Sequence, residues 1–406
     1  MKITDKSLLK KLGAGDSIEK VCSTEGLSSE QFEEWWSSQL ADRVPSSQGV
    51  RTSSADAEIL RDKWGIPHIY AEQDEDLFFG YGYAMAQDRL WQLDYLRRKA
   101  MGRLSEVLGA SALETDTISH TVGMTQLAEA EVRRMSAKTS TRLDAFSRGI
   151  NKFMIESTDL LPIEFDLLDY TPEPWNPMDS IAIWGEFRWY LTGRLPVIVI
   201  PELAMQTLDD DNLYAAFLTG EAESESILAK GMYPSGRSST GRVGQTISDP
   251  SEGQGSNNWT ISGQLTASGL PLVASDPHIA FGSISCWYEA HLSGAGFNAA
   301  GTGYAGVPGL LFGRNEKVAW GLTNNICAQR DLYQEKEDPE KPGYYLYDGQ
   351  WEQAAETNVT INVKGQNQVT QTIRRTRNGP IVDDILPDAA SHTGPVSLPW
   401  MGEDPC

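Results

Sequence analysis

Positive charge is scarce in this chain. Its 406 residues include 34 lysines and arginines against 56 aspartates and glutamates, for a formal net charge of -22. Nucleic-acid backbones and anionic lipid surfaces both need a basic face that neutralises their phosphates. We therefore exclude nucleic acid and anionic membranes as partners. The acidic excess is typical of a solvated surface, and it is more weakly compatible with a bound cation or a cationic substrate.

Cysteine and long apolar runs are also scarce. The four cysteines, Cys22, Cys286, Cys327 and Cys406, are far apart and form no Cys-x-x-Cys pair, which predicts free thiols. Residues 1–20 contain neither the apolar core of a signal peptide nor a membrane span, so we expect a cytoplasmic protein. A hydrophobic content of 40% in a chain of this length predicts a globular protein with a substantial core.

The first half of the chain is rich in helical patterns. Residues 1–50 are predicted to form a helical extension, in which Ser28 and Gln31 make a capping box. The apolar positions 32, 35, 36 and 40 then share one helical face, which we expect to pack on the body of the protein. Residues 51–230 are predicted to be mainly helical after a strand region that begins at 59–60, is interrupted by a turn and includes 64–70.

The amino-acid composition and pattern change after residue 230. Residues 231–255 are dominated by Gly, Ser, Thr and Pro, which predicts a flexible linker. Residues 256–406 alternate between strand and turn patterns and are predicted to form a sheet region. Helices followed by strands predict an α+β fold with layered packing.

Ser256 stands directly after the predicted linker. Cleavage of the Gly255–Ser256 bond would give one residue both a hydroxyl and a free α-amine, whose reference pKa of about 7.7–8.0 suits a general base. The local sequence Gly-Ser-Asn-Asn is by itself also an ordinary turn. The local pattern leaves both interpretations open.

Eight ordered segments carry a further signal. One is GSNNW at 255–259, and the others are RDKWGIPHI at 61–69, GYAMAQDRL at 82–90, GRLSEVLG at 102–109, GVPG at 306–309, GRNE at 313–316, AWGLTN at 319–324 and NGPIV at 378–382. Together they resemble the penicillin acylase family of N-terminal nucleophile hydrolases, and the resemblance extends from about residue 57 to the end. GSNNW resembles the family's processing site, where Ser begins the second chain.

The resemblance implies an αββα sandwich and hydrolysis of the amide between an acyl group and an amine, as in penicillin, cephalosporin and acyl-homoserine-lactone acylases. It implies autoproteolysis before Ser256, which would make the protein a heterodimer of its own two processed chains. Ser256 would be the nucleophile. Asn324 would donate its backbone N–H to the oxyanion. His278 occupies a catalytic position that is His in the cephalosporin and homoserine-lactone branches, although a lone His after Asp-Pro is ordinarily a loop residue.

A calcium ion is a further expectation from the resemblance, because family members often hold one between the two chains. Glu202 and Asp331 match ligand positions, whereas Ala328 stands where an Asp is common. Losing one anionic oxygen ligand should weaken such a site. Outside the site, His68 and His291 are predicted to be structural.

The family's second chain continues well beyond the position that matches Cys406. We expect the sandwich to be incomplete here and the second oxyanion donor, an Asn side chain, to lie beyond this sequence. The alternative to an acylase is therefore a truncated, non-catalytic homologue or fragment that only binds a ligand.

Overall fold

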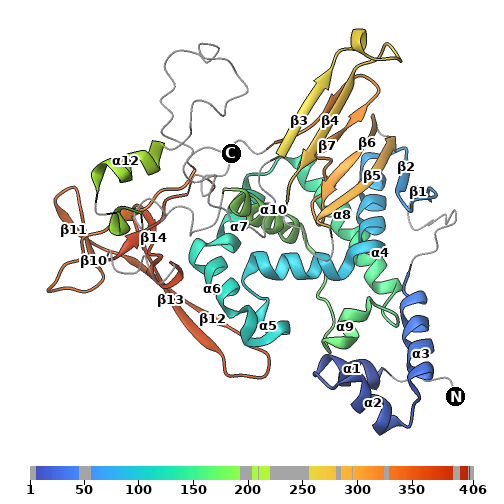
Figure 1. Ribbon diagram of the computed structural model, residues 1–406, viewed down its shortest axis with the longest axis horizontal. Coiled ribbons are helices and arrows are strands. Elements are labelled where there is room, and N and C mark those ends of the chain that lie inside the picture. Colours follow the sequence, from blue (N-terminus) through green and yellow to red (C-terminus); the bar gives the residue numbers. More distant parts are fainter. Residues whose placement is uncertain are drawn as a thin grey trace.

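The computed structural model describes residues 6–44, 56–192, 204–208, 210–219, 256–279, 285–294, 296–323, 329–386, 394–400 and 402. Most helices precede most strands along this chain, and the two kinds of element pack against each other (Figure 1). Outside these residues lie the predicted linker 231–255, which includes Gly255, and the cysteines Cys327 and Cys406. Cys22 and Cys286 are free, as predicted.

The N-terminal extension contains three helices, α1 (Ser7–Gly13), α2 (Ile18–Glu25) and α3 (Ser29–Ala41). The predicted capping box is confirmed, because the Ser28 hydroxyl accepts from the Gln31 N–H and the Gln31 side chain accepts from the Ser28 N–H. Phe32 and Trp35 are buried in a cluster that includes Ile163 of α9 (Ile163–Leu167). Phe32 and Trp35 therefore pack on the protein's own body, as expected, whereas Leu40 of the same predicted face is exposed.

Helix α4 (Asp74–Met101) is the central element of the helical layer and packs along α8 (Ala137–Glu156). Their backbones approach closely because glycines stand where they cross. A Cβ added to Gly82 would lie 2.1 Å from the Phe146 carbonyl oxygen, and one added to Gly149 would lie 2.0 Å from that of Phe79. Helix α10 (Pro177–Leu191) begins with an Asn176 cap and also packs on α4. The described residues also form α5 (Ser105–Leu108), α6 (Leu113–Val122), α7 (Met124–Arg134) and α12 (Asp211–Thr219), with 3₁₀ turns at Gly109–Ala112, Gly263–Leu265 and Asp383–Ile385.

In the described chain, six strands form one sheet in the order β1-β2-β5-β6-β7-β8. Strands β2 and β5 run parallel, and the other neighbours run antiparallel. Ile69, Ala290 and Leu292 point to the side of α4 and share its hydrophobic core. The strands are β1 (Ala57–Arg61), β2 (Pro67–Ala71), β5 (Trp287–Gly294), β6 (Phe297–Tyr304), β7 (Phe312–Asn315) and β8 (Ala319–Trp320).

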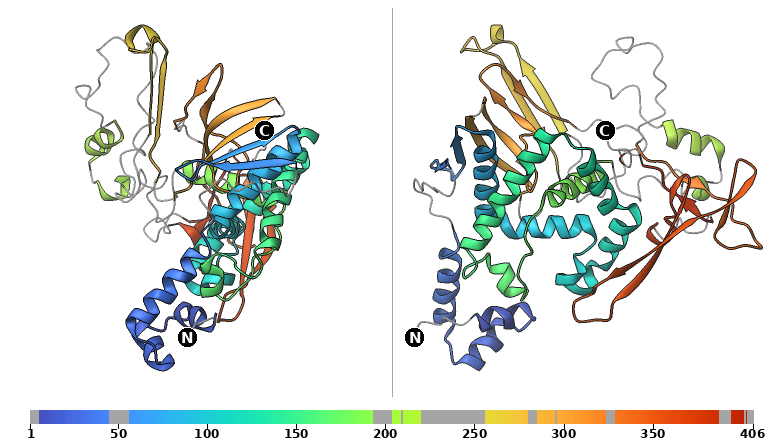
Figure 2. Two further views of the ribbon diagram at one scale, coloured as in Figure 1. Left: turned by 90° about the vertical axis from the view of Figure 1, so that its right-hand side faces the viewer. Right: turned by 180° about the vertical axis from the view of Figure 1, so that it is seen from behind.

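A separate antiparallel hairpin is formed by β3 (Ser256–Ile261) and β4 (Leu272–Pro277). It projects beyond the helical layer and reaches the six-stranded sheet at the β8 edge (Figure 2). The later strands make smaller sheets: β10 (Tyr344–Tyr347) with β11 (Gln350–Gln353), β9 (Tyr333–Gln334) with β15 (Val396–Ser397), and β12 (Ala355–Ile361) with β13 (Val369–Thr376) and β14 (Gly379–Pro380).

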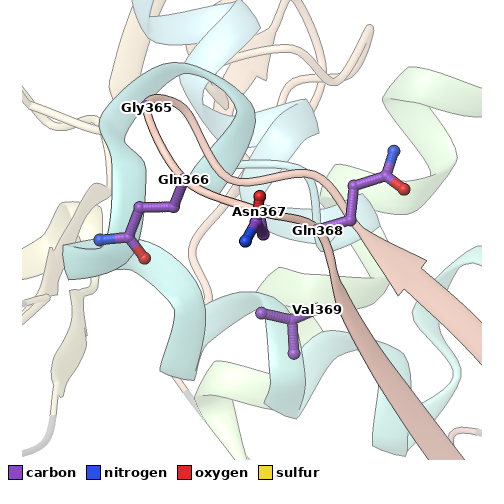
Figure 3. A pocket seen from close by; sticks show the side chains of 5 residues that line it. All are labelled: Gly365, Gln366, Asn367, Gln368 and Val369. Carbon is purple, nitrogen blue, oxygen red and sulfur yellow. The ribbon is translucent and has the colours of Figure 1, made fainter.

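A shallow hollow lies at the turn between β12 and β13 and is lined by residues 365–369 (Figure 3). The turn is tied to the helical layer, because the Lys364 N–H donates to the Ser105 carbonyl at 2.9 Å. The lining contains two glutamines, an asparagine, a glycine and a valine, and it has no charged or nucleophilic side chain. The hollow is therefore a surface feature of the turn and is not the predicted catalytic site.

The α+β class predicted from the sequence is confirmed. The described residues place one helical layer on one face of the six-stranded sheet, which is part of an αββα arrangement. None of the described helices is both long enough and apolar enough to cross a membrane.

Candidate functional site

Ser256 is the first residue of β3 and pairs with Pro277 of β4. Its hydroxyl oxygen accepts a hydrogen bond from the backbone N–H of His278 at 3.3 Å. The residue is partly buried, whereas the next four residues of the strand are exposed. An α-amine created by cleavage before Ser256 would thus lie at a strand end, beside a hydroxyl that already has one backbone donor.

The imidazole of His278 has different partners from its backbone N–H. Its Nε2 lies 2.9 Å from Asp276 Oδ2 and 3.3 Å from Asn257 Nδ2. Asn257 and Asp276 are directly paired across the hairpin, and successive side chains of a strand point to opposite faces. The imidazole therefore lies with the Asn257 side chain, on the face opposite to that of Ser256. Its contact with Asp276 is an ion pair only when the ring is protonated.

The segment 321–323 lies against the same hairpin. The Asn258 side-chain oxygen accepts from the backbone N–H groups of Leu322 at 3.2 Å and Thr323 at 3.3 Å, and its nitrogen donates to Ser275 Oγ at 2.8 Å and to the Asn257 carbonyl at 3.2 Å. This amide orientation is assigned because it matches every donor with an acceptor. Sequence analysis missed Asn258, because nothing local signals a partner about sixty residues away.

Gly321 permits this close approach. A Cβ at position 321 would lie 2.8 Å from both the Asn258 side-chain nitrogen, in the assigned orientation, and the Ser275 Cβ, so a larger residue would push the segment off the hairpin. Ser275 adds a long contact of 3.5 Å from its hydroxyl to the Leu322 carbonyl. Residues 321–323 thus contact the hairpin with which the predicted sheet region 256–406 begins.

The remaining predicted site residues are not brought to this hairpin by the described structure. Asn324, Glu202 and the Ala328 position lie outside the described residues. Asp331 is exposed, and its Oδ1 accepts from the Leu332 N–H at 2.9 Å. Within the described ranges no three His, Cys, Asp or Glu side chains gather as a metal site would require. The calcium ion stays a prediction.

The two histidines predicted to be structural contact each other. His68 of β2 and His291 of β5 are register partners in the parallel pair, and their Nδ1 atoms lie 3.0 Å apart. His291 Nε2 lies 3.0 Å from Asn298 Oδ1, while Asn298 Nδ2 donates to Glu316 at 2.7 Å. This chain of contacts joins three elements of the six-stranded sheet, which fits a structural role.

Cys286 is an alternative nucleophile by residue type. Burial raises the pKa of its thiol to about 11, so the group is protonated at neutral pH. Because the thiolate is the reactive form, Cys286 is a poor nucleophile in this environment. The Ser256 hydroxyl is the better candidate of the two, since it lies at the end of the hairpin and its oxygen accepts a backbone hydrogen bond.

Comparison with known proteins identifies the family. The penicillin amidase family profile matches residues 56–406. The chain belongs to the penicillin amidase family. The family predicted from the ordered motifs is therefore confirmed, and the described structure has the α+β fold expected of it.

Individual relatives carry acylase names. The chain is 32% identical to the acyl-homoserine lactone acylase QuiP of Pseudomonas aeruginosa, over 90% of this chain and 45% of that protein. It is 33% identical to the penicillin acylase 2 proenzyme of Pseudomonas sp. (strain SE83), over 83% of this chain and 45% of that protein. The chain thus spans about half the length of the curated relatives it matches.

Among solved structures, the thermostable penicillin G acylase from Alcaligenes faecalis aligns with a TM-score of 0.37 and 24% identity. That alignment covers 44% of this chain and 96% of the other. The fold assignment rests on the family match and not on this partial superposition.

Proposed function

We propose that this protein is an amide hydrolase, an acylase, that acts through Ser256 as an N-terminal nucleophile. One observation carries the proposal. Residues 56–406 match the penicillin amidase family, and within them Ser256 of the GSNNW motif is the first residue of β3. Its Oγ accepts a hydrogen bond from the His278 N–H. The names of the relatives support amide hydrolysis as the reaction class.

Maturation requires no partner reagent except water. Ser256 Oγ attacks the Gly255 carbonyl carbon, the C–N bond breaks, and the glycyl group is transferred to the hydroxyl oxygen as an ester. The Ser256 nitrogen takes a proton and becomes a free α-amine. Water then hydrolyses the ester, which leaves a Gly255 carboxylate and restores the hydroxyl. The product is a heterodimer of one chain that ends at Gly255 and one that begins at Ser256.

Substrate hydrolysis repeats this chemistry on another amide. The Ser256 α-amine, whose reference pKa of about 7.7–8.0 is close to neutral, takes the hydroxyl proton through a bridging water as Oγ attacks the acyl carbon. The amine part of the substrate then receives that proton from the Ser256 α-amine and leaves. Water hydrolyses the acyl-enzyme and restores the Ser256 hydroxyl. The backbone N–H of Asn324 stabilises the oxyanion, a contribution worth about 100- to 1000-fold in rate for a single donor.

His278 has two roles in this proposal, one through its backbone and one through its side chain. Its backbone N–H holds the Ser256 oxygen at 3.3 Å in the uncleaved chain. Its imidazole, held by Asp276 and Asn257, orders the end of the hairpin that carries the nucleophile. The geometry thus favours a role through the hairpin backbone, and direct proton transfer by the ring would need the side chain to turn to the other face.

The substrate class is inferred from the relatives. An N-acyl-homoserine lactone and a penicillin are the two amides to test first, since they appear in the names of the similar proteins. A calcium ion bound through Glu202 and Asp331 would link the two processed chains, with carbonyl oxygens or water in place of the carboxylate that Ala328 lacks.

The decisive experiment is intact mass and N-terminal sequencing of the purified protein in its longest available form. Cleavage should give a new terminus beginning Ser-Asn-Asn-Trp, and the Ser256→Ala variant should stay intact. Ser268→Ala, which removes an exposed hydroxyl from the turn of the same hairpin, is the matched control and should be cut like the parent. Cleaved protein should then hydrolyse one of the two amides.

A second candidate function is a non-catalytic homologue that keeps the fold and binds an acyl amide. It is favoured by the direction of the His278 ring, which contacts Asp276 and Asn257 on the face opposite to that of Ser256. An uncut parent chain that binds an amide in calorimetry without hydrolysing it would support this alternative. Cleavage that persists in Ser256→Ala would contradict both the nucleophile and the maturation scheme.

A further inference from the structure

His68 of β2 and His291 of β5 face each other on the side of the six-stranded sheet that is opposite to α4. Their neighbours Ile69 and Leu292 point to α4 and share its core, and successive side chains of a strand alternate between the two faces. The Nδ1 atoms of the two rings lie 3.0 Å apart, and the ring planes are tilted by 75°. The His68 side chain is 34% exposed and His291 is partly buried, so within the described chain both rings reach solvent.

The other nitrogen of each ring, Nε2, lies near a side-chain oxygen. His291 Nε2 is 3.0 Å from Asn298 Oδ1, and that amide orientation is assigned because Asn298 Nδ2 donates to Glu316 at 2.7 Å. His68 Nε2 is 3.8 Å from the carboxylate oxygen Oδ2 of Asp62. Both oxygens favour a proton on Nε2. The Nδ1 lone pair of each ring is then directed at the other ring.

This arrangement of the two rings is the one that metal-binding histidines adopt. Two bare nitrogen lone pairs at 3.0 Å repel each other unless a proton or a metal ion lies between them. Neutral imidazole nitrogens are common ligands of zinc, copper and nickel ions. Histidines that bind a metal through one nitrogen usually donate the other N–H to a carboxylate or carbonyl oxygen, which fixes the tautomer and the ring. A carboxylate has this place beside His68, and an amide oxygen has it beside His291.

We propose that His68 and His291 form an open binding site for a divalent transition-metal ion such as Zn²⁺, which is bound by both Nδ1 atoms and by water. Two nitrogens on one tetrahedral zinc ion are about 3.3 Å apart, so the rings need only a small separation from their present distance. Two protein ligands are fewer than a closed metal site uses, so water completes the coordination and the ion can exchange. The inference does not depend on the proposed function, because it uses neither Ser256 nor His278.

The bound ion would add to the structural role of the two histidines. Strand β2 precedes the proposed cleavage point and β5 follows it, and their parallel pairing comprises three residue pairs in the described chain. An ion on both rings would therefore link the two chains of a processed protein directly. Carboxylates near the pair attract cations: Asp62 contacts His68, and Glu289 is exposed on the same face of β5 as His291.

The test is calorimetric titration of the purified protein with Zn²⁺ alone. We expect one ion per chain. His68→Gln and His291→Gln should each lower the affinity by more than about 100-fold, because each removes one of two protein ligands. Asn298→Ala should lower it by about 10-fold, the loss typical for a group that orients a ligand. The matched control is Glu289→Gln, which removes a carboxylate from the same strand face and should stay within about twofold of the parent.

Two further measurements separate the site from general effects. Mg²⁺ prefers carboxylate and water ligands, so it should not compete with Zn²⁺ for this site. In electron paramagnetic resonance, bound Cu²⁺ should show coupling to two imidazole nitrogens in the parent and to one in either histidine variant. Urea midpoints measured without metal show whether a histidine variant is folded. Asn298→Ala changes an exposed residue and gives the answer if neither histidine variant folds.

Each outcome supports or overturns the site. Zinc binding that both histidine variants lose and Glu289→Gln keeps supports it. A parent that binds no zinc overturns it and leaves a proton as the group between the rings. Binding that survives both histidine substitutions, or that Glu289→Gln or Mg²⁺ abolishes, means that carboxylates of this acidic chain hold the ion and also overturns the proposal. With both histidine variants unfolded, unchanged zinc binding in Asn298→Ala overturns it.

Discussion

The helical layer around α4 and the β3–β4 hairpin differ sharply in how they are held. Leu93, Tyr81 and Phe146 are fully buried between α4, α8 and the sheet. In the hairpin, Leu265 is 81% exposed, and Trp259 and Leu272 are at least half exposed. The helical layer is thus stabilised by apolar burial, whereas the hairpin depends on strand pairing and on polar contacts such as those of Asn258.

The charged groups show the same difference. Asp94 on α4 is 1% exposed, and it accepts from Arg97 at 2.5 Å and 2.8 Å, from Arg98 at 2.8 Å and from the Tyr170 hydroxyl at 2.9 Å. Asp276 on β4 has a side chain that is 69% exposed and pairs with His278. The first carboxylate binds two buried arginines within the helical layer, and the second contacts the His278 ring at the exposed end of the hairpin. In this chain the proposed chemistry therefore lies on the less stabilised element.

The largest expected effect comes from a matched pair of leucines. Leu93→Ala should lower the free energy of unfolding by about 4 kcal/mol, because it removes buried methyl groups and leaves a cavity. Leu265→Ala should change it by less than about 0.5 kcal/mol, since that side chain is already in water. Urea denaturation of both variants beside the parent measures the difference. Similar losses in the two variants would show that the hairpin is buried in solution.

A matched pair of carboxylates should give a smaller effect. Asp94→Asn leaves Arg97 and Arg98 buried with less counter-charge and should cost about 3 kcal/mol of unfolding free energy. Asp276→Asn should cost less than about 1 kcal/mol, because exposed ion pairs contribute little. Thermal unfolding monitored by circular dichroism would show the contrast as a large shift for the first variant only. A stable Asp94→Asn protein would contradict the structural role assigned to that cluster.

The smallest expected effect is a loss of folding stability at low pH through Glu173. Two hydrogen bonds from Arg103, at 2.7 Å and 2.9 Å, hold the pKa of Glu173 at about 2, below its ordinary 4.5. A carboxyl whose pKa is lowered by folding contributes stability above pH 4.5, and that contribution is lost as the pH falls through about 2. Because the pair is partly exposed, we expect less than about 1 kcal/mol.

Glu173→Gln should therefore be slightly less stable than the parent at pH 6, and the two should converge as the pH approaches 2. Urea midpoints measured across this range test the sign. A difference that grows toward low pH would mean that the ion pair is not formed in solution.

The sequence by itself determined the features that depend on neighbouring residues or on family pattern. Ser28 and Gln31 form the predicted capping box because both partners belong to one helical turn. The change from helical to strand patterns predicted the α+β class, and the ordered motifs predicted the family that the comparison confirmed. Ser256 was predicted as the nucleophile from the GSNNW motif, and it remains a proposal until cleavage is measured.

Only the tertiary structure decided the features that join distant parts of the chain. The parallel pairing of β2 and β5 places His68 against His291, although no local pattern links the two histidines. The direction of the His278 ring and the contact of Asn258 with Leu322 and Thr323 depend on the register of β3 with β4 and on the approach of β8. Strand pairing and side-chain contacts of this kind connect residues far apart in sequence, so no local pattern encodes them.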